Sequence, residues 1–391
     1  MPSPHTHPNL PTDEENALLI GRVWDPSVNG PCVVTIRNGT FIDITSRDTL
    51  TVRDVMEKDA PAQYVAAQTG RSIGSTADIF ANSVAATKDQ TAPYLLAPCD
   101  FQSIKACGVT FAGSMIERVI EERAQGDLEK AAGIRDRVQS VIGSSLDDVT
   151  PGSQQAADIK IALIAEGMWS QYLEVGIGPD AEVFSKAQVL SSMGWGDNVG
   201  LHPQSKWNNP EPEIVLAVNS RGEILGSTLG NDVNLRDIEG RSALLLSKAK
   251  DNNASCAIGP MIRLFDSSFS LDDVCNAELN MTITGEDGYV LNGHSSMKKI
   301  SRHPADLVSQ TIGRHHQYPD GLMLFCGTLF APTEDRDIEG QGFTHKRGDV
   351  VRISSPHLGA LQNTVYLSTE CSEWTFGASQ LMRNLAGRDL L

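Results

Sequence analysis

The sequence predicts an α+β protein in which short strands predominate. β-branched and apolar residues form short runs at 32–36 and 40–44, and the turn residues at 37–39 separate them; such runs are typical of paired strands. From residue 174 onward, short strand patterns and Gly or Pro turns again predominate. Helical periodicity is concentrated between about 114 and 170. Strand runs and helix runs in separate stretches indicate an α+β fold.

The 391 residues predict three segments. Residues 1–16 are rich in Pro and His and carry acidic residues where a signal peptide would need an apolar core, so we expect a disordered leader. Residues 17–95 predict a small amino-terminal α+β domain, which ends in a stretch punctuated by prolines. Residues 96–391 predict a second domain, with a helical insertion at about 114–170.

Apolar residues at helical spacing predict helices in both domains. In the insertion, Ile116, Val119 and Ile120 share one face of a helix. Ser114 and Glu117 match a capping box, in which the serine caps the first turn and the glutamate reaches back to the cap nitrogen. The predicted helices cover residues 52–58, 114–143, 153–169, 242–250 and 304–312.

Composition is that of an ordinary globular protein and excludes some functions. The net charge of -17, from 32 basic and 49 acidic residues, makes nucleic acid a poor partner, because phosphate binding depends on clustered Lys and Arg. No apolar run approaches the roughly 20 residues needed to span a bilayer, so we expect no membrane insertion. The seven cysteines include no CxxC pair, which indicates reduced thiols in a cytoplasmic protein.

Two carboxylates stand where a predicted hairpin begins. Residues 213–218 form a mostly apolar run, residues 219–222 favour a turn, and a return strand starts at residue 223. Glu211 and Glu213 then share one face, because side chains alternate along a strand.

The open end of this hairpin gathers a third carboxylate. With the turn centred on its two middle residues, Glu211 lies opposite Gly230, and Asp232 falls just beyond that end. Glu211, Glu213 and Asp232 would then converge, with no cysteine or histidine in the hairpin. Oxygen-only ligands suit magnesium or manganese better than zinc, and so few ligands leave positions for substrate oxygens and water.

Simpler explanations remain open for several of these patterns. An exposed acidic strand end on an acidic protein would show the same carboxylate spacing. Lys250 ends the fourth predicted helix and could complement the dipole of that helix. The glycine-rich stretch 194–200 misses the GxGxxG spacing of a nucleotide loop, and His315 and His316 lack the spacing of a helical metal pair.

An ordered series of short motifs resembles the fumarylacetoacetate hydrolase superfamily from about residue 96 to the carboxyl terminus. Each motif is weak alone, but their number and order argue against chance agreement. The motifs are Glu211-Pro212-Glu213, Asn231-Asp232-Val233, Arg236-Asp237, Lys248-Ala249-Lys250, Ile258-Gly259-Pro260, Gly327-Thr328 and the runs 347–351 and 358–363.

This resemblance implies a fold, a cofactor and an activity. The fold is a mixed, strand-rich β-roll that forms the catalytic domain, and the cofactor is a magnesium or manganese ion on Glu211, Glu213 and Asp232. The chain is most similar to the bacterial 2-keto-3-deoxy-pentonate dehydratases of oxidative pentose breakdown. Such an enzyme would convert a small-molecule 2-keto-3-deoxy sugar acid to 2,5-dioxopentanoate, and the resemblance implies a homodimer or homotetramer. The closer similarity rests on residues 169–174, 191–197, 250–256 and 341–346.

One departure from the family pattern bears on the reaction. Family hydrolases commonly carry a His and a Glu three residues apart, after a Gly-x-Asn-Tyr segment, and this dyad activates water. Here residues 108–111 correspond to that segment, Ser114 stands in the place of the histidine, and Glu117 is retained. The departure favours elimination over hydrolysis, because a lone glutamate can still take or give a proton.

The resemblance also assigns roles to residues around the ion. As a hypothesis, Lys250 removes the C3 proton and Glu117 protonates the departing C4 hydroxyl, although the two roles could be exchanged. By family position, Arg236 and Thr328, with the adjacent Gly327, would orient the carboxylate and keto oxygens. Two other functions remain open: hydrolysis of acylpyruvates or 2,4-diketo acids, and non-catalytic binding of a sugar acid.

Overall fold

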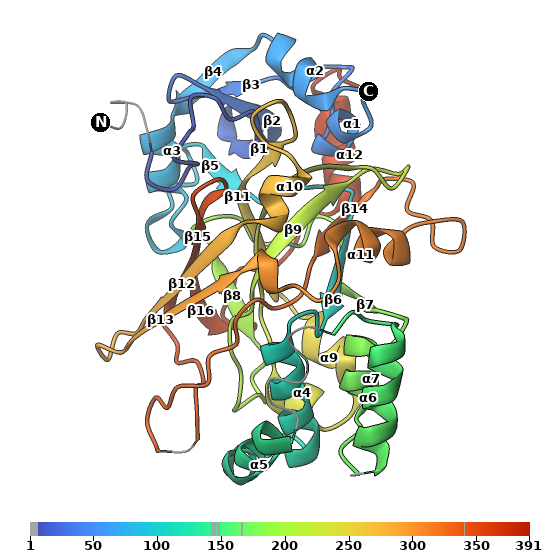
Figure 1. The fold of residues 1–391 in the computed structure, drawn as a ribbon. Helices are drawn as coiled ribbons and strands as arrows, with labels where there is room; N and C mark the ends of the chain where they lie inside the picture. Colours follow the sequence, from blue (N-terminus) through green and yellow to red (C-terminus); the bar gives the residue numbers. More distant parts are fainter. Residues whose placement is uncertain (1–6, 142–145, 147–148, 166, 340) are drawn as a thin grey trace.

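The computed structural model describes residues 7–141, 146, 149–165, 167–339 and 341–391. Within these residues, strands form an eleven-stranded sheet and a five-stranded sheet (Figure 1). The amino-terminal elements and the last helix lie at one end of the molecule, and a group of helices lies at the other. The predicted strand-rich α+β class is confirmed.

The large sheet runs through the whole molecule. It is mixed: β14 and β6 pair in parallel, whereas β14 and β9, and β6 and β7, pair antiparallel. The strand order ends at β4 and β7, so the sheet is open. Its order is β4 (Arg71–Ser75), β3 (Thr40–Asp43), β2 (Gly30–Arg37), β1 (Leu19–Asp25), β11 (Cys256–Leu264), β10 (Ile224–Asp232), β9 (Pro212–Val218), β14 (Leu322–Phe325), β6 (Ser103–Gly108) and β7 (Glu182–Ala187), with β5 (Tyr94–Leu96) beside β1.

The small sheet packs against the centre of the large one. Its order is β13 (Val290–Ser296), β12 (Glu278–Thr284), β15 (Val350–Ser355), β16 (Gly359–Leu367) and β8 (Asn198–Leu201). Apolar side chains of both sheets, such as Leu216, Leu229 and Ile353, belong to one buried cluster. Every residue of β9 is buried, which is why this strand reads as a nearly continuous apolar run.

The amino-terminal segment differs from one prediction. Residues 7–16 were expected to belong to a disordered leader, but they form turns packed on the body of the protein. Leu10 is buried, and Asp13 accepts two hydrogen bonds of 2.7 Å from Arg263. Residues 1–6 lie outside the described part. β1 pairs with β11, so the large sheet continues across the domain boundary predicted near residue 95. The boundary itself stays a prediction.

Helices cover the ends of the sheets. The first has a capping box between Thr51 and Asp54, and α11 begins with a proline at its first helical position. Around the sheets lie α1 (Val52–Met56), α2 (Pro61–Ala67), α3 (Thr76–Asn82), α8 (Arg236–Glu239), α9 (Leu246–Lys250), α10 (Leu271–Cys275), α11 (Pro304–Thr311), α12 (Ala378–Gly387) and the short 3-10 helices η1 (Pro26–Val28), η2 (Ala85–Thr87), η4 (Ala243–Leu245) and η5 (Met297–Lys299).

The predicted helical insertion forms a cluster of its own beside β7. It contains α4 (Ala112–Ala124), α5 (Leu128–Val141), α6 (Gln154–Ala165) and α7 (Gln171–Ile177), which Figure 1 shows together at one end. Met115, Val119 and Leu173 belong to the apolar cluster that joins these helices. The stripe predicted for the first helix therefore faces its neighbours, and the insertion holds one face of α4 toward the sheet.

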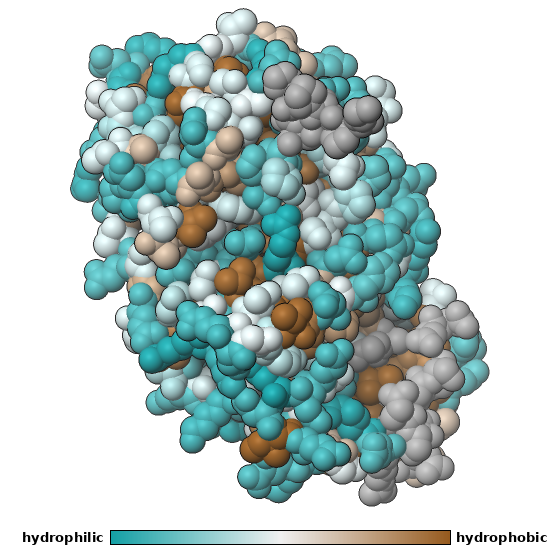
Figure 2. Space-filling view, turned by 90° about the vertical axis from the view of Figure 1, so that its left-hand side faces the viewer, coloured by the Kyte–Doolittle hydropathy of each residue, from teal (hydrophilic) through white to brown (hydrophobic). Residues whose placement is uncertain are grey.

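The distribution of hydrophobic residues is that expected of an ordinary globular composition. Figure 2 shows a face on which hydrophobic residues occur singly or in small groups among hydrophilic ones, outside the grey atoms. Among the described residues, no helix has the length and apolar character that crossing a bilayer requires.

Candidate metal centre

The predicted hairpin is present with a different register. Glu213 lies opposite Gly230, where the sequence predicted Glu211. The turn is centred on Arg221, as the Asn219 to Glu223 hydrogen bond shows, and a bulge follows in β10. These two effects move the pairing by two residues in total. A shift of two residues keeps the same face of a strand, so the carboxylates still meet.

Glu211, Glu213 and Asp232 converge at the open end of this hairpin, as predicted. Their carboxylates offer ligand atoms within 4.8 Å of one another, and this is the one such group of His, Cys, Asp or Glu among the described residues. None of the three residues is more than 3% exposed. The N–H of Asp232 donates to the carbonyl of Glu211 over 3.0 Å, which ties the ends of the two strands together.

The three carboxylates repel one another, which favours the binding of a cation between them. Burial and the neighbouring carboxylates of Asp232 and Glu211 raise the pKa of Glu213 well above its usual value. Burial also opposes ionisation of Asp232, but the ammonium groups of Lys186 and Lys250 outweigh it and lower its pKa. Three buried carboxylates without nitrogen or sulfur ligands fit a hard divalent ion, which would relieve their mutual repulsion.

Gly327 and Thr328, which follow β14, hold Glu213 in place. The N–H of Gly327 donates to one carboxylate oxygen of Glu213 over 2.7 Å, and the hydroxyl of Thr328 lies 3.5 Å from the other. Gly327 has a φ of +100°, and a Cβ there would approach the hydroxyl of Thr110 to 1.9 Å. Both residues therefore lie in the site, while their predicted contact with substrate stays a prediction.

Lys250 enters the site from the end of α9 rather than facing solvent beyond it. Its Nζ lies 3.2 Å from Glu211, 3.4 Å from Asp232 and 3.6 Å from Glu239. Burial alone would lower the pKa of Lys250, but these carboxylates raise it instead. In this arrangement Lys250 is held as a cation, which argues against the predicted role as a base. The sequence placed Lys250 in the site, and its predicted catalytic role stays a prediction.

Lys186 is a second buried lysine, which the sequence analysis did not find. Its side chain is fully buried, and its Nζ lies 2.8 Å from the Asp232 oxygen that Lys250 does not contact. The ammonium also donates to the main-chain carbonyls of Val233 and Lys250, at 3.3 Å and 2.9 Å. Local sequence gave no signal for Lys186, because a bulge in β7 between Ser185 and Ala187 interrupts the alternation of side chains along the strand.

We expect Lys186→Met to destabilise the protein in the absence of metal. Removing one partner of a buried ion pair typically costs roughly 3–5 kcal/mol. Here one carboxylate oxygen of Asp232 loses its ammonium partner, while Lys250 still contacts the other. Added magnesium should restore part of this loss, so the magnesium-induced rise in Tm should be larger than in the wild type. Thermal unfolding with magnesium or a chelator measures both effects. Lys248→Met, at an exposed position of the same helix as Lys250, is the control; equal behaviour of the two variants would contradict the assignment.

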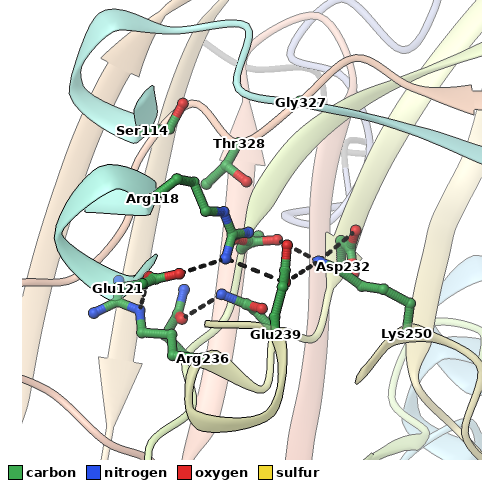
Figure 3. A network of polar contacts seen from close by, with 12 residues as sticks. Ser114, Arg118, Glu121, Asp232, Arg236, Glu239, Lys250, Gly327 and Thr328 are labelled. Carbon is green, nitrogen blue, oxygen red and sulfur yellow. Dashed lines mark hydrogen bonds and ion pairs between the residues drawn. The ribbon is translucent and has the colours of Figure 1, made fainter. Parts of the chain in front are cut away.

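Two arginines join these carboxylates to a second acidic group (Figure 3). Arg118, from α4, lies 2.6 Å from Glu211, 2.8 Å from Glu121 and 3.2 Å from Glu239. Arg236 lies 3.1 Å from Glu121 through its Nε. The Nη2 atom of Arg236 is buried and has no hydrogen-bond partner among the described residues. Its predicted contact with a substrate carboxylate stays a prediction.

Glu182, on β7, is a carboxylate that the sequence analysis missed. Within the described part of the chain it makes no hydrogen bond or ion pair through its side chain, and a Cβ at Gly108 would approach its Oε2 to 1.8 Å. It lines a cavity of about 210 Å³ together with Glu239. Burial and the charge of Glu239 raise the pKa of Glu182 to about 7, although Arg118 and Lys250 act in the opposite direction. Such a group can exchange a proton near neutral pH.

Ser114 and Glu117 are not arranged as predicted. α4 begins at Ala112 after Phe111, so Ser114 does not cap it, and its hydroxyl donates to the carbonyl of Phe111 over 2.8 Å. Both carboxylate oxygens of Glu117 accept hydrogen bonds from Arg135, at 3.1 Å and 3.0 Å. The predicted capping box is wrong, because the helix begins two residues before Ser114 and because Arg135 from α5 binds the carboxylate of Glu117. The same ion pair argues against Glu117 as the acid.

Together these residues define a buried three-carboxylate centre beside Glu182, a carboxylate that has no ion-pair partner among the described residues. Such an arrangement can support metal-assisted acid–base chemistry. Residues 191–366, less than half of the chain, match the model of the fumarylacetoacetate (FAA) hydrolase C-terminal family. The match includes the three carboxylates and Lys250, while the helical insertion and β7 precede it.

Two curated relatives and two solved structures are similar to the chain. The "Probable 2-keto-3-deoxyxylonate dehydratase" of Haloferax volcanii is 32% identical over 51% of this chain and 64% of the relative. The "2-dehydro-3-deoxy-D-arabinonate dehydratase" of Saccharolobus solfataricus is 30% identical over 46% of this chain and 57% of the relative. The matched region thus spans less than two thirds of either relative.

The solved structures share the fold. "2-keto-3-deoxy-D-arabinonate dehydratase apo form" has a TM-score of 0.63 at 20% identity, covering 90% of this chain and 99% of that one. The same enzyme "complexed with magnesium and 2,5-dioxopentanoate" has a TM-score of 0.62 at 21% identity, with the same coverage. The expected fold of the fumarylacetoacetate hydrolase type is confirmed.

Proposed function

We propose that the protein is a metal-dependent hydro-lyase that converts a 2-keto-3-deoxy-pentonate to 2,5-dioxopentanoate. The names of both curated relatives and the magnesium complex of the structural neighbour support this activity. The observation that carries the choice of elimination is the state of the water-activating position. Ser114 replaces the histidine, and Arg135 binds both oxygens of Glu117.

Glu211, Glu213 and Asp232 would hold the divalent ion. When bound, magnesium or manganese polarises the 2-keto group of the substrate and increases the acidity of its C3 protons. Lys250 and Lys186 keep the Asp232 carboxylate ionised and fixed between them. The Nη2 of Arg236, which has no hydrogen-bond partner among the described residues, would bind a substrate oxygen.

Glu182 replaces Lys250 as the proposed base. Its carboxylate is free of ion pairs within the described part, whereas Lys250 is held as a cation by three carboxylates. Glu182 takes a proton from C3, the C3–C4 double bond forms, and hydroxide leaves C4. The proton and the hydroxide together account for one molecule of water. Tautomerisation of the unsaturated product to the aldehyde gives 2,5-dioxopentanoate without further loss of atoms.

The dependence of kcat/KM on pH should show an acid limb from Glu182. A base must be ionised, so activity should fall as the pH decreases through the pKa of this group. Burial and Glu239 raise that pKa to about 7, and a bound cation favours the carboxylate, so the limb should lie at or below about pH 7. Initial rates between pH 5 and 9 at saturating magnesium measure it. Activity that rises as the pH falls from 8 to 6 would contradict a base of this kind.

Product analysis with two substrate classes tests the proposed function. The metal-loaded protein is incubated with a 2-keto-3-deoxy-pentonate and, separately, with an acylpyruvate, each with a chelator control. We expect 2,5-dioxopentanoate from the first, and its loss on chelation. Pyruvate from the acylpyruvate alone would show that the protein is a hydrolase despite Ser114. Binding without turnover of either substrate would identify a sugar-acid binding protein.

We also propose that the protein acts in the cytoplasm as a homodimer or homotetramer. All seven cysteines are free, and six of them are buried, which supports a reducing compartment. The family resemblance supports self-association. Light scattering of the purified protein tests the oligomeric state, and a monomer would contradict it.

A further inference from the structure

A cavity lined by Glu182 and Glu239 lies near the three carboxylates. It has a volume of about 210 Å³ and is bounded by α7, β7 and the segment from α8 to α9. Glu239 also lies 3.2 Å from Arg118 and 3.6 Å from Lys250, and both of these cations contact Glu211. The cavity is therefore one side chain away from the carboxylate centre. Its lining residues are Gln171, Tyr172, Val175, Glu182, Glu239, Ala243 and Leu246.

Tyr172 contributes the one hydroxyl group of this lining. The residue is only 5% exposed, and its ring belongs to the apolar cluster of the helical insertion. Within the described part of the chain its hydroxyl has no hydrogen-bond partner, although buried tyrosines usually have one. The hydroxyl of Ser170 accepts the main-chain N–H of Tyr172 over 3.1 Å and fixes the start of α7, so the ring has a defined position.

The charges around this hydroxyl favour its donating a hydrogen bond. Burial, and then the carboxylate of Glu239, raise the pKa of Tyr172 above its usual value, so the phenol stays protonated at neutral pH. The other walls combine two carboxylates with the apolar side chains of Val175 and Leu246. Such a lining suits the end of a short carbon chain that carries hydroxyl groups, with carboxylates as acceptors and Tyr172 as a donor.

We propose that this cavity is the subsite for the hydroxyl-bearing end of the substrate and that the hydroxyl of Tyr172 donates a hydrogen bond to the C5 hydroxyl. The inference rests on the proposed function, because it assigns the end of the sugar acid that points away from the three carboxylates. The stretch 169–174, which contributed to the closer similarity of the sequence, contains this tyrosine. The subsite would discriminate hydroxylated acids from unsubstituted keto acids of the same length.

Tyr172→Phe, which removes only the hydroxyl, tests the proposal. We expect kcat/KM for the 2-keto-3-deoxy-pentonate to fall roughly three- to tenfold, mainly through KM, as for the loss of one neutral hydrogen bond. Affinity for 2-oxopentanoate, which has five carbons and no hydroxyl beyond C2, should not change in calorimetric titrations with magnesium present. Tyr366→Phe, on β16 and outside the cavity, is the matched control and should change neither value.

The outcomes separate this inference from the proposed function. Unchanged kcat/KM in Tyr172→Phe, or an equal loss of affinity for both acids, would overturn the subsite while leaving dehydration in place. If the wild type binds the pentonate without turnover, the proposed function fails, and titration with the pentonate decides the subsite alone. A selective loss of pentonate affinity in Tyr172→Phe then supports it, and equal affinity of variant and wild type overturns it.

Discussion

Glu213→Gln is expected to abolish metal binding and turnover together without unfolding the protein. The amide keeps the shape of the side chain and can still accept the hydrogen bond from Gly327, but it removes one of three charged ligands. We expect magnesium affinity to fall roughly a hundredfold or more and turnover roughly a thousandfold. Calorimetric titration with magnesium and steady-state kinetics measure the two effects.

The thermal stability of this variant is a second, independent test of the metal assignment. The pKa of Glu213 is higher in the folded protein than in the unfolded chain. The free energy of unfolding therefore decreases as the pH rises from the unfolded-state pKa of Glu213 through its folded-state pKa. At pH 7.5 without metal, Glu213→Gln should therefore be at least as stable as the wild type, while magnesium no longer raises its Tm. Glu223→Gln, at the exposed end of the same hairpin, is the control. Near-normal activity of Glu213→Gln, or a normal magnesium shift, would remove the metal assignment.

Glu182→Gln is expected to lose turnover while keeping the metal. A positioned general base typically contributes roughly a hundred- to ten-thousandfold to the rate, and the amide cannot take a proton. Glu182 is not one of the three proposed ligands, so magnesium affinity should stay within about threefold of the wild type. Single-turnover rates and magnesium titrations measure these two quantities. Comparable activity of wild type and variant would return the base assignment to Lys250 or to another group.

Local patterns were sufficient to predict the three carboxylates. An apolar run, a turn and a return run define a hairpin, and alternation puts Glu211 and Glu213 on one face. The register was wrong, because a turn centred on Arg221 and a bulge in β10 are set by backbone details that the turn residues do not specify. The carboxylates still met because the two errors together equal one full period of a strand.

Contacts between distant segments explain the residues that the sequence did not reveal. Lys186 and Glu182 reach the site from β7, which the sheet order β9-β14-β6-β7 places beside β6 and in the same sheet as β9. Similarly, Arg135 binds the carboxylate of Glu117, which was predicted to act on the substrate. Arg263 binds Asp13 in a segment that was expected to be disordered. In each case one charged side chain from another element decides the outcome, and no local pattern records which partner it takes.

Proton NMR of a 2-keto-3-deoxy-pentonate, recorded while magnesium is added to metal-free protein, tests metal-dependent dehydration directly. A metal-dependent dehydratase should give an aldehyde signal from 2,5-dioxopentanoate that appears only with metal, grows with magnesium occupancy and stops on chelation. Formation of pyruvate and a two-carbon aldehyde would show cleavage of the carbon chain instead of dehydration. That result, or an aldehyde signal that is independent of metal, would contradict metal-dependent dehydration by this protein.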